Sequence, residues 1–168
     1  MKLAVMSDSH DHISHLRAAV DMLIAAGAGA IIHCGDLVAP FMLAELARAD
    51  VPVHAVFGNN DGDIHKLTTV ALTQFPQITF HGLVGETALG GQSVAFTHYE
   101  TVARGLALSG RFSWVFFGHT HTYHEERVGE AILLNPGDVM GKKTAPGFVI
   151  IDLKSGDIAH QRLQPSAA

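Results

Sequence analysis

The 168-residue chain has little charge, one tryptophan and one cysteine, and these shortages exclude several classes of protein. Charged residues make up only 16% of the chain and apolar residues 48%, so a disordered protein is excluded and a buried core is expected. The 11 lysines and arginines are scattered under a net charge of −5, which disfavours long nucleic acid as a partner. The single cysteine, Cys34, excludes an internal disulfide and favours a reducing, cytoplasmic location.

Long apolar runs and targeting segments are also missing. The longest apolar stretch, residues 22–32, follows Asp21 and contains two glycines, so no membrane-spanning helix is expected. Residues 1–6 meet polar residues at once and lack the features of a signal peptide. The length and the lack of an internal linker predict a single domain over residues 1–168, in which only residues 164–168 are expected to fray.

The order of apolar runs and turn residues predicts an α/β fold. Strands are expected at residues 2–6, 30–34 and 53–57, and helices between them, one running from Asp11 as its N-cap to about Ala26 and one at residues 40–48. This order predicts parallel βαβ units. The second half reads as β-rich, with strands expected at residues 78–80, 87–89, 93–97, 113–117, 125–128, 131–134, 148–153 and 158–163, and a helix at 101–108. The pattern predicts two sheets packed face to face between helices.

Histidine is abundant, with 12 residues, and several histidines follow predicted strands together with other polar residues. These strand-end residues are Asp8, His10, Asp36, Asn59, Asn60, Asp61, His98, His119 and His121. In an extended segment residues two apart point the same way, so Asp8 is expected to converge with His10, and His119 with His121. Each cluster alone also fits a simpler interpretation: turn carboxylates, asparagines in left-handed turns, or histidines satisfied in the core.

Taken together, the strand-end residues point to a metal centre, because carboxylates brought close together repel each other and a cation relieves the repulsion. Aspartate, histidine and asparagine without thiolate suit Mn²⁺, Fe²⁺ or Zn²⁺. Seven ligating side chains exceed what one ion with an open position needs and are about right for two ions. A carboxylate can touch both ions, and Asp36 is the candidate for this shared position.

The ordered series Asp8-Ser9-His10, Gly35-Asp36, Gly58-Asn59-Asn60-Asp61, His98 and Gly118-His119-Thr120-His121 resembles the calcineurin-like metallophosphoesterase family. The short length and the Asn135-Pro136-Gly137 loop resemble its small prokaryotic phosphodiesterase branch. The resemblance implies a four-layer α/β/β/α sandwich of two mixed β-sheets flanked by helices, with a dinuclear metal site at one edge. It implies one ion held by Asp8, His10, Asp36 and His121, and another held by Asp36, Asn59, His98 and His119. Mn²⁺ is the expected ion, with Fe²⁺, Zn²⁺, Ni²⁺ and Mg²⁺ as alternatives.

The resemblance also implies an activity. The expected enzyme is a metal-dependent phosphoesterase, in particular a phosphodiesterase, that hydrolyses a small phosphate ester with a hydroxide shared by both ions as the nucleophile. A homodimer or larger homo-oligomer is implied as well. The alternative from another class is a protein-binding scaffold on the same fold with weak or residual activity, as in the retromer subunit that resembles this family. All seven ligand positions are filled with ligating residues, which speaks against the scaffold.

Three further residues, Asn60, Asp61 and Glu100, are candidate catalytic residues. Many relatives carry a histidine at the position of Asn60. Asparagine can donate a hydrogen bond but cannot deliver a proton, so a preference for good leaving groups such as aryl esters is predicted. Many relatives also carry a second histidine where this chain has Glu100, which can serve as an extra ligand, as an acceptor behind a ligand, or as an exposed residue.

Overall fold

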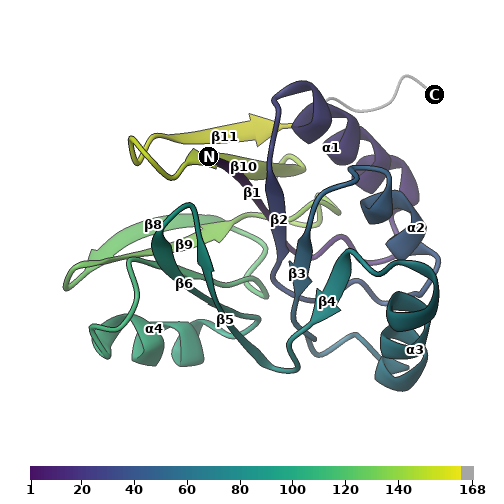
Figure 1. The fold of residues 1–168 in the computed structure, drawn as a ribbon, viewed down its shortest axis with the longest axis horizontal. Helices are drawn as coiled ribbons and strands as arrows, with labels where there is room; N and C mark the ends of the chain where they lie inside the picture. The colour runs from purple at the N-terminus through teal and green to yellow at the C-terminus, as the bar shows by residue number, and fades with distance from the viewer. Residues whose placement is uncertain (164–168) are drawn as a thin grey trace.

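The computed structural model describes residues 1–163, and the tail predicted to fray, residues 164–168, lies outside the described residues (Figure 1). The described residues form strands β1 Lys2–Met6, β2 Ala30–His33, β3 Val53–Ala55, β4 Ile78–Phe80, β5 Val84–Leu89, β6 Gln92–Thr97, β7 Trp114–Phe116, β8 Tyr123–Val128, β9 Ala131–Pro136, β10 Gly147–Asp152 and β11 Ile158–Arg162. The helices are α1 Ile13–Ala25, α2 Met42–Ala47, α3 Ile64–Gln74 and α4 Glu100–Leu108. No helix within residues 1–163 is long and apolar enough to cross a membrane.

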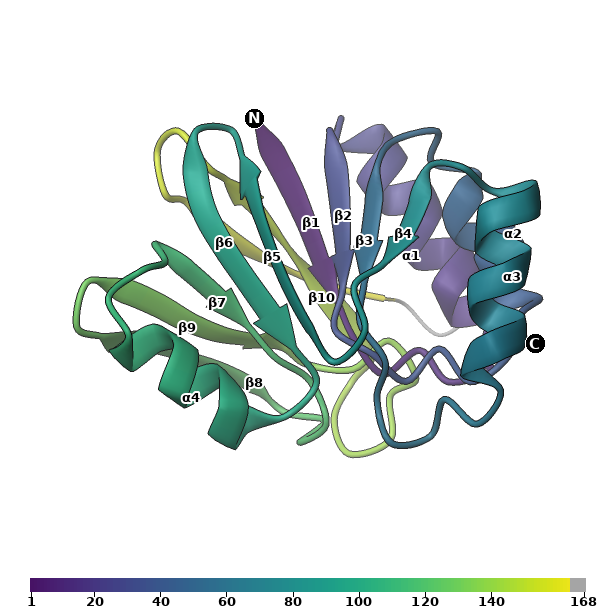
Figure 2. The ribbon, with the colours of Figure 1, turned by 60° about the horizontal axis from the view of Figure 1, so that its bottom comes forward.

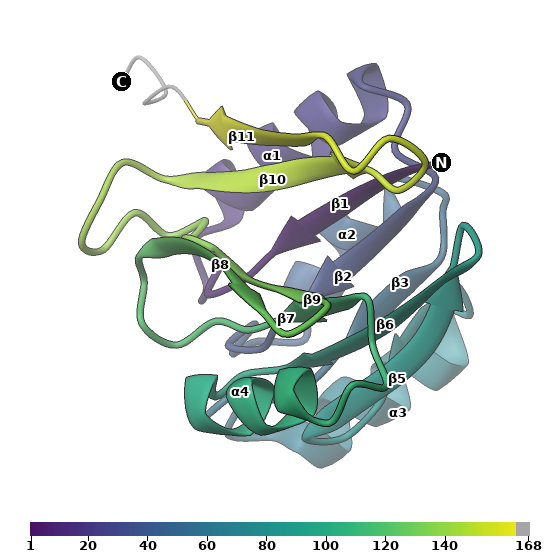
Figure 3. The ribbon, with the colours of Figure 1, turned by 90° about the vertical axis from the view of Figure 1, so that its left-hand side faces the viewer.

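The strands form the two mixed sheets that the sequence predicts. The first sheet has the order β11-β10-β1-β2-β3-β4, in which β1 to β4 run parallel and β10 runs antiparallel to β1 (Figure 3). The second sheet has the order β5-β6-β7-β9-β8, in which β6, β7 and β9 run parallel between two antiparallel edge strands. Strands β1, β2 and β3, with helices α1 and α2 between them, form the predicted βαβ units.

The two sheets pack face to face between helices, which confirms the predicted four-layer α/β/β/α sandwich. Figure 2 shows α4 on the outer face of one sheet and α1, α2 and α3 on the outer face of the other. Strand β1 explains the arrangement, because its residues alternate between the two faces: Leu3 and Val5 belong to the core between the sheets, and Ala4 and Met6 to the core under the helices.

One prediction about the helices is wrong, and one helix was not predicted. Helix α1 buries Leu16 and Val20 as its spacing predicts, but its N-cap is His12, whose Nδ1 accepts the His15 backbone N–H, and not Asp11. Helix α3 falls where no element was predicted, because only two of its residues, Leu67 and Ala71, are buried and the apolar period is weak.

The ends of the parallel strands meet at one edge of the sandwich, where the polar segments follow (Figure 2). Backbone hydrogen bonds join these segments at the end of each sheet: the Asp8 N–H donates to Gly35 O, the His10 N–H to Asp36 O, and the Gly118 N–H to His98 O. The loop after β9 joins the same edge, since the Met140 N–H donates to Asp8 O. Segments far apart in the sequence therefore converge on one small region.

Candidate metal centre

The backbone at this edge is held in an unusual conformation. Within residues 1–163, seven non-glycine residues have positive φ, and five of them are Asp8, His10, Asp36, His119 and His121, with φ between 46° and 67°. Left-handed backbone costs about 1–2 kcal/mol for a residue with a Cβ and concentrates at functional sites. Asn59 and Asn60, by contrast, do not have positive φ, so the interpretation of them as left-handed turn residues is wrong.

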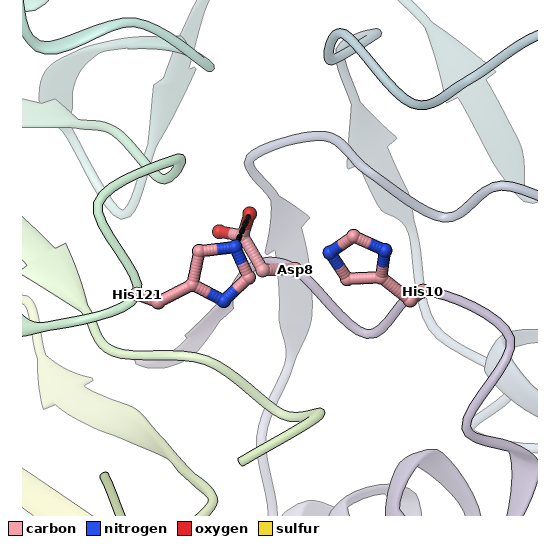
Figure 4. A group of neighbouring side chains, drawn as sticks. All are labelled: Asp8, His10 and His121. Atoms are coloured by element: carbon pink, nitrogen blue, oxygen red, sulfur yellow. Dashed lines mark ion pairs between the residues drawn. The ribbon is translucent and has the colours of Figure 1, made fainter. Parts of the chain in front are cut away.

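The first group of side chains contains Asp8, His10 and His121, whose ligating atoms lie within 4.8 Å of one another (Figure 4). His121 Nε2 lies 3.4 Å from Asp8 Oδ1, and the rings of His10 and His121 stack with centroids 5.5 Å apart. Asp8 Oδ2 accepts hydrogen bonds from Ser7 Oγ at 2.5 Å and from the His119 N–H at 2.9 Å. These two bonds leave Asp8 Oδ1 facing the imidazoles.

The second group contains Asp8, Asp36 and His98, whose ligating atoms also lie within 4.8 Å of one another. His98 Nδ1 donates to Cys34 O, which leaves Nε2 facing Asn59 Oδ1 at 3.0 Å. The ring of His119 lies beside that of His98 with a centroid distance of 5.0 Å. The seven predicted ligands are thus all brought to one edge of the sandwich.

Asp36 lies between the two groups. Its Oδ2 is 3.7 Å from His10 Nε2 and 3.5 Å from His98 Nε2, so one carboxylate oxygen faces an imidazole from each predicted ligand set. Asp8 also belongs to both groups, but among the described residues its carboxylate pairs with one imidazole, that of His121. These contacts favour Asp36 as the shared ligand.

The two buried carboxylates have opposite pKa shifts. Burial raises the pKa of Asp8 against the opposing hydrogen bond from Ser7. Burial also acts to raise the pKa of Asp36, but hydrogen bonds from His98 and Asn60 outweigh it and hold this pKa below its usual range. For His98, burial acts to lower the pKa, and the neighbouring Asp36 and Asp8 carboxylates outweigh it, so the pKa is raised. Of the two carboxylates, Asp36 is thus the one held in its ionised form, and its negative charge attracts cations.

The predicted catalytic residues occupy different surroundings. Asn60 donates twice to Asp36, from Nδ2 to Oδ2 at 2.7 Å and from its backbone N–H to Oδ1 at 2.8 Å. Asp61 is buried, and its carboxylate accepts the backbone N–H groups of Asp36, Gly58 and Val38. Asn60 thus orients the Asp36 carboxylate, and Asp61 orients the backbone around it.

Glu100 is drawn away from the ligands. Its Oε1 accepts from Arg104 Nη2 at 3.3 Å, and Arg104 also pairs with Glu126 at 2.9 Å. The Glu100 side chain is 43% exposed. These contacts favour the third of its predicted alternatives, an exposed residue, which stabilises the first turn of α4 through an i,i+4 ion pair.

Two glycines make room for the carboxylates. A Cβ on Gly58 would collide with Asp36 Oδ1, and a Cβ on Gly118 would collide with Ser7 Oγ and lie 2.7 Å from Asp8 Oδ2. Any larger residue at either position would displace a candidate ligand. The Gly-Asn and Gly-His pairs in the sequence therefore serve the site through close approach of the backbone.

Sequence reasoning missed three residues that support the site. Ser7 donates to Asp8, and Asp138 Oδ2 accepts from His121 Nδ1 at 2.7 Å. Asn135 Nδ2 donates to Gly118 O and to Thr120 Oγ1, which holds the backbone beside His121. The Asn-Pro-Gly-Asp run that contains two of these residues was visible in the sequence, but nothing there showed which histidine it meets.

The donor set fits divalent cations. Asp8 Oδ1 and His10 Nε2 are buried and have no hydrogen-bond partner among the described residues, an arrangement that is costly unless a ligand completes it. The surrounding donors are carboxylate, imidazole and amide groups, which suit borderline and hard divalent ions.

The chain is similar to known phosphoesterases. A sequence model of the calcineurin-like phosphoesterase superfamily domain matches residues 1–156. The protein named Phosphodiesterase MJ0936, from Methanocaldococcus jannaschii, is 30% identical over 158 residues, which cover 90% of this chain and 93% of the relative.

Solved structures of a phosphodiesterase and a phosphoesterase are also similar to this chain. A novel archaeal phosphodiesterase superposes with a TM-score of 0.91 at 28% identity, covering 97% of this chain and all (100%) of the other. YfcE, a phosphoesterase from E. coli, superposes with a TM-score of 0.69 at 18% identity, covering 98% of this chain and 100% of the other. The second similarity shows the shared fold alone.

Proposed function

Because the chain belongs to the calcineurin-like phosphoesterase superfamily, we propose that it is a dinuclear metal-dependent phosphodiesterase acting on a small phosphate ester. The observation that carries the proposal is the pair of buried, unpartnered ligating atoms, Asp8 Oδ1 and His10 Nε2, at an edge where five ligand candidates have left-handed backbone. A scaffold with no metal to hold would gain nothing from this strain.

One ion would be held by Asp8, His10, Asp36 and His121, and the other by Asp36, Asn59, His98 and His119. When bound, such a pair of divalent ions lowers the pKa of a water molecule to near neutrality and stabilises negative charge on phosphate oxygens. Asp8 and Asp36 supply two negative charges against the four positive charges of two divalent ions. The loaded centre then keeps a net positive charge, which attracts a phosphate ester.

The roles of the other candidate residues follow from their contacts. Asn60 holds Asp36 in place through two hydrogen bonds and has no proton to give to a departing alkoxide. We therefore expect rates that depend steeply on the leaving group, with aryl esters favoured over alkyl esters. Asp61 positions the backbone of residues 36–38, and Glu100 takes no part in the chemistry.

The test is hydrolysis of matched aryl phosphate mono- and diesters by protein reconstituted with Mn²⁺, and separately with Fe²⁺, Zn²⁺, Ni²⁺ and Mg²⁺. We expect metal-dependent turnover, faster on the diester, and loss of turnover in an Asp36→Asn variant that still folds. Absence of metal-dependent turnover on both esters would contradict the proposal and favour the protein-binding scaffold.

Several narrower expectations stay predictions. They are Mn²⁺ as the ion used, a cytoplasmic location, a homodimer or larger homo-oligomer, the single domain over residues 1–168, and the lack of long nucleic acid as a partner. Cys34 is buried and belongs to the core between the two sheets, where it packs as a small apolar residue.

A further inference from the structure

Asp138 is a buried carboxylate to which the proposed function gives no role. It follows β9, has an exposed fraction of 0%, and accepts from His121 Nδ1 at 2.7 Å through Oδ2. Its Oδ1 is buried without a hydrogen-bond partner among the described residues. A buried carboxylate beside a ligand histidine calls for a physical account, because its desolvation is costly.

We propose that Asp138 is a positioning residue that acts through His121 and makes the ion site on that side the tighter of the two. The inference rests on the proposed dinuclear centre. It goes beyond that centre by ranking the affinities of the two ion sites and by naming the residue that makes them differ.

The hydrogen bond fixes how His121 presents its ring. A carboxylate only accepts hydrogen bonds when ionised, so Nδ1 carries the hydrogen and Nε2 is the nitrogen turned toward Asp8 Oδ1 at 3.4 Å. A carboxylate behind a metal-binding imidazole orients the ring and increases its basicity, and loss of such a partner typically lowers metal affinity by about 10–100-fold.

The other side of the centre lacks this support. His98 Nδ1 donates to the backbone carbonyl of Cys34, a neutral acceptor, at 2.8 Å. The second ligand set adds the neutral Asn59 and no carboxylate besides the shared Asp36. The first predicted ligand set contains Asp8 besides the shared Asp36, and Asp138 lies behind its His121. Both rings are oriented by a hydrogen bond at Nδ1, so the charge of Asp8 and Asp138 is what favours binding on the first side.

Backbone hydrogen bonds hold Asp138 in place in addition to its side chain, whose Oδ2 also accepts the Lys142 backbone N–H at 2.7 Å. The Gly147 N–H donates to Asp138 O, and the next two residues bind the end of β1 through Val139 N–H to Ser7 O and Met140 N–H to Asp8 O. His15 Nδ1 lies 3.1 Å from the carbonyl oxygens of both Val139 and Met140. Removing the charge of Asp138 should leave this loop folded.

The test is calorimetric titration of metal-free protein with Mn²⁺, which reads binding without substrate. The wild type should show two affinities. Asp138→Asn, which has nearly the same shape and keeps an acceptor oxygen, should lower the tighter affinity by about 10–100-fold and change the weaker one much less. Glu130→Gln, which removes a charge from an exposed residue in the β8–β9 turn, should change neither.

A second variant tests the ranking of the two ion sites through the weaker site. Asn59→Asp places a carboxylate in the weaker set and should raise the weaker affinity toward the tighter one. Thermal unfolding of the metal-free variants checks that each folds, and saturating Mn²⁺ should restore most of the turnover of Asp138→Asn. Two equal affinities in the wild type, or equal weakening of both by Asp138→Asn, would overturn the inference. Absence of hydrolysis with the binding pattern intact would instead contradict the proposed function alone.

Discussion

Acidification should destabilise the protein through His33, a histidine enclosed at the end of β2. Its side chain is fully buried, its Nε2 lies 3.0 Å from Ser9 Oγ, and its Nδ1 has no hydrogen-bond partner among the described residues. Burial lowers the pKa of His33 to about 3, although the nearby Asp36 carboxylate opposes the shift. The imidazole is therefore neutral in the folded chain at pH 5, whereas in the unfolded chain, with a pKa of about 6.5, it is protonated.

The magnitude follows from proton linkage. The unfolded state binds the extra proton, so the free energy of unfolding falls as the pH drops below the unfolded pKa of about 6.5. At pH 5 the gap is roughly 1.5 pH units, and each unit is worth about 1.4 kcal/mol, which gives about 2 kcal/mol. For a chain of this size that loss corresponds to roughly 4–8 °C in Tm. The loss would continue as the pH fell further and stop near the folded pKa of about 3.

The assay is urea unfolding of the metal-free wild type and of His33→Gln at pH 7.5 and pH 5. Glutamine can keep a hydrogen bond to Ser9 but has no proton to bind in this range. Burial also lowers the pKa values of His54 and His81. These two histidines destabilise the wild type and the variant alike on acidification, so their effect cancels in the comparison. The wild type should lose about 2 kcal/mol more than the variant between the two pH values. Equal losses would refute the assignment of the effect to His33.

The remaining predictions concern the metal ligands, the leaving group and two glycines. Calorimetry should show that Asp36→Asn abolishes tight binding of both Mn²⁺ ions. His121→Gln should weaken the binding of mainly one ion. Two tightly bound ions in Asp36→Asn would show that the shared ligand is wrongly assigned. Asn60→His should raise kcat on alkyl esters by about 10²-fold, the lower end of general-acid catalysis, and leave aryl esters little changed; an equal change on both would contradict the proposed role. Gly85→Ala should lower the free energy of unfolding by about 1–3 kcal/mol, because the added Cβ would overlap the ring of Phe96, which pairs with Gly85 on β6. Gly105→Ala, in open space on α4, should raise the free energy of unfolding by up to about 1 kcal/mol. Urea unfolding measures both variants, and shifts of the same sign would contradict the difference in packing between Gly85 and Gly105.

The sequence was sufficient for the parallel βαβ units of the first half and for the place of the site, because apolar runs ending in polar residues mark buried parallel strands. It was insufficient for α3. That helix contains Ile64, Val70 and three threonines, which lower helix propensity, and it packs against strand β4, which follows it in the chain. One local signal was available, since Asp63 Oδ1 caps the helix by accepting the Lys66 N–H at 2.9 Å.

The convergence of the ligands was predicted for the wrong physical reason. Asp8 was expected beside His10 because alternate residues of an extended chain point the same way, but β1 ends at Met6 and both residues are left-handed. Aspartate and histidine occur in turns for many reasons, so no local pattern distinguishes this conformation. It is set by bonds to another strand's end, from the Asp8 N–H to Gly35 O and from the His10 N–H to Asp36 O. The ligand geometry is thus a property of two strand ends folded against each other, and a ligand's type can be read from the sequence while its direction cannot.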